Sequence, residues 1–80
     1  MLRIAKQTKL RPDDIIDKAS TYFGKKGQGL EEKDRNSCCV SFEGAGGYVA
    51  ITVADESNHR MVDVETTEFE YQAKHFLKIL

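Results

Sequence analysis

The chain has 80 residues, of which 40% are hydrophobic and 31% are charged, and its formal net charge is −1. This length and composition predict a single globular domain over residues 1–80 and exclude a disordered or fibrous protein. No apolar run approaches the roughly 18 residues of a membrane span, and residues 1–6 carry charges where a signal peptide is apolar. We therefore expect a cytoplasmic protein that makes no contact with a membrane.

The charges are unevenly distributed along the chain. Residues 1–29 have a net charge of +4, whereas residues 30–80 have a net charge of −5. A nucleic-acid-binding protein usually has a strongly basic contact surface, and only the first third of this chain can supply one. From the charge pattern we therefore do not expect nucleic acid as a partner.

The first two predicted elements are a strand and a helix. Leu2, Ile4 and Leu10 share one parity of an alternating segment, which predicts a half-buried strand. Pro12 ends this strand and is favoured at the first position of a helix. An apolar stripe at helical spacing then runs to Gly24, a typical helix stop: Ile15, Ile16, Ala19, Tyr22 and Phe23.

The middle of the chain predicts four strands. Residues 30–34 fit a charged edge strand, although their composition also suits a helical turn. A two-residue hairpin loop at Ala45 and Gly46 places Phe42 opposite Val49, and a polar turn over residues 55–59 continues the meander. This register puts the apolar residues of three strands on one face: Val40, Phe42, Val49, Ile51, Val53, Val62 and Val64.

The last predicted element is a helix. Thr67 and Glu70 have the spacing of a capping box. The apolar face that follows consists of Phe69, Ala73, Phe76, Leu77 and Leu80. The whole chain is therefore predicted to be an α+β domain of order β-α-β-β-β-β-α, with a single antiparallel sheet and two helices packed on one face.

The two cysteines, Cys38 and Cys39, are adjacent in the sequence. A disulfide between neighbours departs from the usual geometry, and the pair lacks the spacing of a zinc site, which neither His59 nor His75 completes. We expect no disulfide, no metal and no cofactor. Cys39 is expected at the same end of the sheet as His59, and a histidine near a cysteine can activate the thiol as a nucleophile. This is a weak signal, because an isolated cysteine more often packs as a small apolar side chain. The chain is therefore predicted not to be an enzyme.

The sheet face opposite the helices is the main candidate site. Its predicted residues have a small or apolar centre with an acidic border, and the candidate contacts are Cys39, Ser41, Tyr48, Ala50, Thr52 and Met61. One interpretation is a solvated antiparallel sheet, which commonly faces water on one side. The other is a surface for a protein partner or a second copy of the chain, because Tyr and Met are frequent in interfaces.

Two glycine-containing loops suggest nucleotide or RNA binding. The segment at residues 44–49 has Val49 where a dinucleotide fingerprint needs its third glycine, and it leads into a strand, so a hairpin turn explains it better. The segment Gly24-Lys25-Lys26-Gly27 resembles the backbone-clamping loop of KH RNA-binding domains, which makes Lys25 and Lys26 candidate nucleic-acid contacts. In that family a helix follows the loop, whereas here a strand is expected, and the end of a helix explains the glycines equally.

The predicted element order resembles the TATA-binding-protein-like fold and the core of the helix-grip proteins related to START and Bet v 1 domains. It is also similar to that of small prokaryotic domains for which the resemblance implies no activity. The TATA-binding-protein-like resemblance implies DNA held against the open sheet. The helix-grip resemblance implies an apolar ligand held under the last helix, near Phe69 and Phe76. The acidic border of the sheet opposes DNA. The sequence thus favours a binding module that uses its open sheet face, with a small apolar ligand or weak KH-like RNA binding as alternatives.

Overall fold

The computed structural model describes residues 2–44, 46–56 and 58–80. Its elements occur in the predicted order, which confirms the α+β class: β1 (Leu2–Thr8), α1 (Pro12–Phe23), β2 (Glu31–Arg35), β3 (Cys39–Gly44), β4 (Gly47–Asp55), β5 (Arg60–Thr67) and α2 (Glu70–Lys78). Within these described residues, neither helix is long and apolar enough to cross a membrane.

The five strands form one sheet in the order β1-β5-β4-β3-β2, and all neighbours are antiparallel. The predicted register is confirmed, because Phe42 pairs with Val49 and Val53 pairs with Val62. Gly44 pairs with Gly47 at the first hairpin. The predicted turn residues Ala45 and Ser57, like Met1, lie outside the described residues.

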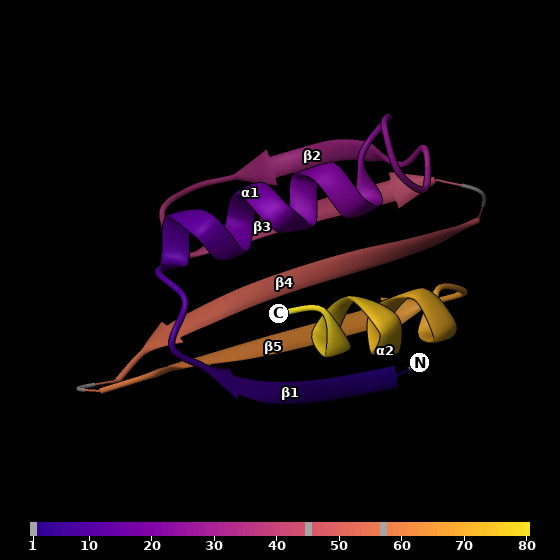
Figure 1. The fold of residues 1–80 in the computed structure, drawn as a ribbon. Helices are drawn as coiled ribbons and strands as arrows, with labels where there is room; N and C mark the ends of the chain where they lie inside the picture. Colours follow the sequence, from indigo (N-terminus) through magenta and orange to yellow (C-terminus); the bar gives the residue numbers. More distant parts are fainter. Residues whose placement is uncertain (1, 45, 57) are drawn as a thin grey trace.

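Both helices cover the same face of the sheet (Figure 1). Helix α1 packs on β3 and β4, and α2 packs on β1 and β5. The core lies between these two layers and is centred on phenylalanine rings: the ring of Phe23 lies 5.7 Å from that of Phe42 and 5.4 Å from that of Phe76. The apolar side chains on one face of the strands and those on one face of each helix thus pack together in a single hydrophobic cluster.

Strand β2 confirms the predicted edge strand, shifted by one residue. All five of its residues are exposed, whereas the preceding Leu30 is buried in the core. Polar contacts hold β2 to α1: Ser20 donates a hydrogen bond to Glu32 at 2.7 Å, and Arg35 forms an ion pair with Asp17. A charged strand therefore closes this side of the sheet.

The predicted capping box is wrong. Thr67 remains in β5, where it pairs with Tyr48, and α2 begins after Phe69 with no side-chain hydrogen bond at its cap. The turn between β5 and α2 is tight, since Glu68 has a φ of 74°. A Cβ at Gly47 would lie 2.3 Å from the main-chain oxygen of Thr67, so the neighbouring strand also requires glycine here.

The expectation of no disulfide is also wrong, because the structure joins Cys38 and Cys39 through their sulfur atoms. Cys38 lies in the bend before β3, so the two side chains need not point to opposite faces as they would inside a strand. Asn36 Oδ1 accepts hydrogen bonds from the main-chain N–H groups of both cysteines, each at 3.0 Å, and fixes this bend. Cys39 therefore has no free thiol to act as a nucleophile.

Candidate functional site

The sheet face opposite the helices carries the residues predicted for it. Cys39 pairs with Thr52 and Ser41 pairs with Ala50 across β3 and β4. Thr52 is exposed, and the rest of the predicted set is half-buried. No element of the described chain covers this face, because both helices lie on the other one (Figure 1).

A shallow hollow of about 390 Å³ lies on this face over β1, β5 and β4. We call it the sheet hollow, and it is lined by Arg3, Ile4, Ala5, Thr52, Ala54, Met61 and Asp63. The small side chains of Ala5 and Ala54 leave room beside the longer side chain of Met61. Of the predicted contacts, only Thr52 and Met61 line the sheet hollow. The β1 residues were not among the predicted contacts, because β1 reaches this face by pairing with β5, which lies far from it in the sequence.

Two pairs of polar side chains flank the sheet hollow and part of the predicted face. The Arg3 guanidinium donates to Asp63 Oδ2 at 2.7 and 3.0 Å, and this hydrogen bond raises the pKa of Arg3. The Tyr48 hydroxyl donates to Glu65 Oε2 at 2.6 Å, which raises the pKa of the Tyr48 phenol, with burial adding to the effect. Since these carboxylates already have partners, burying them under another protein costs less than burying free charges.

The weak hint of catalysis finds no support in this geometry. Cys39 shares its row of the sheet with Thr52 and Asp63, whereas His59 precedes β5 and lies four residues before Asp63. Four residues of extended chain span about 13 Å, so the imidazole does not meet the sulfur. Among the described residues, no three His, Cys, Asp or Glu side chains lie close enough together to hold a metal ion.

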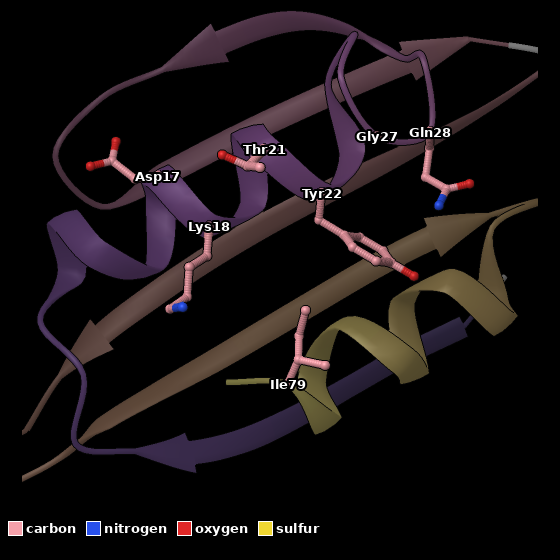
Figure 2. A pocket seen from close by; sticks show the side chains of 7 residues that line it. All are labelled: Asp17, Lys18, Thr21, Tyr22, Gly27, Gln28 and Ile79. Atoms are coloured by element: carbon pink, nitrogen blue, oxygen red, sulfur yellow. The ribbon is translucent and has the colours of Figure 1, made fainter.

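A second and larger hollow lies between the two helices (Figure 2). This interhelical cleft has a volume of about 540 Å³ and is lined by Asp17, Lys18, Thr21, Tyr22, Gly27, Gln28 and Ile79. Figure 2 shows Lys18 and Tyr22 extending from α1, and Ile79 from the end of α2, into the space between the helices. Its volume is within the range of small-molecule sites.

Tyr22 closes one end of the interhelical cleft. Its ring lies 5.8 Å from those of both His75 and Phe76 on α2 and thus bridges the two helices. Burial raises the pKa of the Tyr22 phenol, and the nearby Tyr71 adds to this shift. The cleft therefore combines an aromatic wall and the exposed Ile79 with the polar ends of Lys18 and Gln28.

The cleft does not lie where the sequence places an apolar pocket. Phe76 is fully buried and Phe69 nearly so, and neither of them lines the interhelical cleft or the sheet hollow. The phenylalanine rings fill the space between α2 and the sheet. Room for a ligand remains beside the end of α2, where Lys18 and Ile79 line the space between the two helices.

Lys25 and Lys26 are exposed in the loop that ends α1, far along the chain from the other candidates. The loop folds back on the helix: Gly27 N–H donates to the Gly24 oxygen at 3.0 Å, and Gln28 N–H donates to the Tyr22 oxygen at 2.9 Å. It leads into β2, not into a helix. The glycines are therefore explained by the end of α1, and the element that follows the loop in KH domains is missing.

The chain matches no model of a known protein family and has no significant match among curated proteins. The geometry of its own surfaces is therefore the basis for a functional proposal.

Proposed function

We propose that this chain is a non-enzymatic binding module that recognises a protein partner through its open sheet face. One observation carries this proposal. The face left bare by both helices contains the sheet hollow, which offers Met61 and small side chains to a partner while the adjacent Asp63 is already paired with Arg3. Methionine is enriched in protein interfaces and adapts its shape to the surface that it meets.

The charges on this face favour a basic partner. Glu43, Asp63 and Glu65 border the face. Two cations lie near them, and each is already paired: Arg3 with Asp63, and Lys33 with Glu31 beside Glu43. A second copy packed face to face would bring these carboxylates toward one another, which is unfavourable. A partner with an aliphatic or aromatic side chain for the sheet hollow, flanked by Lys or Arg, fits both the shape and the charge. The same carboxylates oppose DNA on the sheet.

A selection from a displayed peptide library tests this proposal with a defined probe. We expect the enriched peptides to share an aromatic or aliphatic anchor flanked by basic residues. Ala54→Arg should weaken their binding by roughly a hundredfold, because the new side chain occupies the sheet hollow and repels a basic rim. Ala54 is exposed, so the variant should fold normally.

The matched control is Lys18→Glu, a charge change on the helix side of the molecule. It should leave the affinity of the selected peptides within about threefold of the wild type. The proposal is wrong if no peptides are enriched, or if Ala54→Arg binds the enriched peptides as tightly as the wild type does. If the protein instead forms a concentration-dependent dimer that Ala54→Arg abolishes, then the open sheet face binds a second copy of the chain and not a different protein.

A second candidate function is the binding of a small apolar ligand in the interhelical cleft. The observation that favours it is the opening of about 540 Å³ between Tyr22 and Ile79, because Ile79 is 49% exposed in a position that a ligand would cover. A fragment screen followed by NMR should shift the signals of Thr21, Tyr22 and Ile79, and Ile79→Lys should remove these shifts. Shifts confined to other parts of the protein would exclude the cleft.

A further inference from the structure

The two edges of the sheet differ in how open they are. β2 is short, is charged at every position, and has a register shift between Glu32 and Asp34, which are devices that discourage another strand from pairing with an edge. β1 is longer, and all its residues pair with β5 without a shift. Its outer side pairs with no strand of the described chain. β1 is therefore the edge at which an added strand would find regular backbone partners.

Helix α2 lies beside β1 (Figure 1). Side chains of both elements line a groove along this edge. We call it the edge groove. It has a volume of about 380 Å³ and is lined by Ile4, Ala5, Lys6, Lys74, Leu77 and Lys78. An edge strand with a helix alongside is an arrangement in which proteins bind extended peptides by adding a strand to the sheet.

The charge of the edge groove is positive. Lys74 and Lys78 are exposed and form no ion pair with any described residue. Glu70 lies one turn before Lys74 but is not paired with it, and no acidic side chain of the described residues lines the groove. Lys6 is already used, because its Nζ donates to the main-chain oxygen of Leu77 at 2.7 Å. The two free lysines are thus the groups that an incoming ligand would meet.

The occupant follows from these charges. A β1 strand from a second copy would bring the lysines of two edges together, which opposes pairing. An extended segment with Glu or Asp at alternate positions would place its carboxylates beside Lys74 and Lys78 while its backbone pairs with β1. Ile4 and Leu77 offer apolar contact between these charges.

We propose that the edge groove between β1 and α2 binds an acidic, extended segment of a protein partner by strand addition. The edge groove shares Ile4 and Ala5 with the sheet hollow but calls for a ligand of the opposite charge. Its lysines come from β1 and α2, whereas Asp63 on β5 lines the sheet hollow.

The test uses fluorescence anisotropy with three labelled peptides. The first alternates Glu and Val, the second alternates Lys and Val, and the third repeats the first with N-methyl groups on alternate amides, which removes the donors for strand pairing. We expect only the first to bind, with an affinity that falls as salt is added. Hydrogen exchange at the amides of β1 should slow on binding, since an added strand pairs with those that face outward.

The double change Lys74→Glu and Lys78→Glu should weaken binding of the first peptide by roughly tenfold or more. The matched control is Lys25→Glu with Lys26→Glu, which alters the net charge equally in the distant loop and should change the affinity by less than about threefold. Equal losses in the two double variants, equal binding of the N-methylated peptide, or no binding of the first peptide would each overturn the proposal. Ala54→Arg should leave this binding unchanged, so a failure here is distinct from a failure of the open-face proposal.

Discussion

The link between Lys6 and α2 provides a quantitative test of how the short C-terminal helix is held. Lys6 lies on β1 and is half-buried, and its Nζ donates to the main-chain oxygens of Leu77 at 2.7 Å and Leu80 at 3.4 Å. It thus places a positive charge at the negative end of α2, where unsatisfied carbonyl groups gather. Lys6→Met keeps most of the aliphatic stem and removes only this charge and its hydrogen bonds.

The expected loss follows from these contacts. A cation at a partly buried helix C-terminus contributes up to about 2 kcal/mol, and a charged hydrogen bond roughly 1.5–3 kcal/mol, but part of both is recovered when water solvates the carbonyls. We therefore expect Lys6→Met to lower the free energy of unfolding by about 1–2 kcal/mol. For a domain of this length, that corresponds to a decrease in Tm of roughly 5–15 °C.

Urea unfolding followed by circular dichroism measures this loss, and hydrogen exchange locates it. Protection should fall most at the amides of α2, because β3 and β4 do not depend on Lys6. Lys9→Met is the matched control: Lys9 is exposed, forms no ion pair with described residues, and should change the stability by less than about 0.5 kcal/mol. If Lys6→Met is as stable as the wild type, or if both variants lose the same free energy of unfolding, then Lys6 does not hold α2 in this way.

Other consequences can be checked directly. Glu65→Gln should lower the pKa of Tyr48 toward its ordinary value of 10.0, which an ultraviolet titration of the phenol would show. The Tyr48–Glu65 hydrogen bond needs a protonated phenol. Its stabilising effect is therefore complete below pH 10.0 and is lost as the pH rises through the raised pKa of Tyr48. An unchanged titration curve would contradict the pairing. Protein that is denatured without a reducing agent should contain no free thiol, and the detection of two free thiols would rule out the Cys38–Cys39 bond. Replacing both cysteines by Ser should change the free energy of unfolding by less than about 1.5 kcal/mol, because a bond between neighbours closes almost no loop. Gly47→Ala should cost about 2 kcal/mol or more in thermal unfolding, because its Cβ would collide with the turn before α2; an unaffected Tm would show that this turn can move.

The strand register was predictable because two local signals agree. The glycines at residues 44–47 set the turn, and with that turn Phe42 faces Val49 on the apolar side of both strands. The start of α2 was not predictable from its capping pattern. Pairing with Tyr48 keeps Thr67 in β5, and this contact between strands outweighs a weak local preference.

The open face was only partly predictable. Alternation within β3, β4 and β5 identifies residues such as Met61 and Thr52, but the sheet hollow also needs Ala5 and Arg3. These residues reach it because β1 pairs with β5 almost sixty residues later in the chain, and no local pattern specifies such a pairing. The interhelical cleft was not predictable for the same reason: it exists because the two helices pack on the sheet at a distance from each other, which no local pattern specifies.

We propose that the sheet hollow is a recognition surface, and this proposal can be tested by binding. The most direct measurement is the dissociation constant of one peptide, selected on the wild type, for the wild-type protein and for Ala54→Arg. We expect the affinity to fall roughly a hundredfold in Ala54→Arg, while the Tm of this variant stays within a few degrees of the wild-type value. Equal dissociation constants for the two proteins would contradict it and would move the search for a function to the helix side of the molecule.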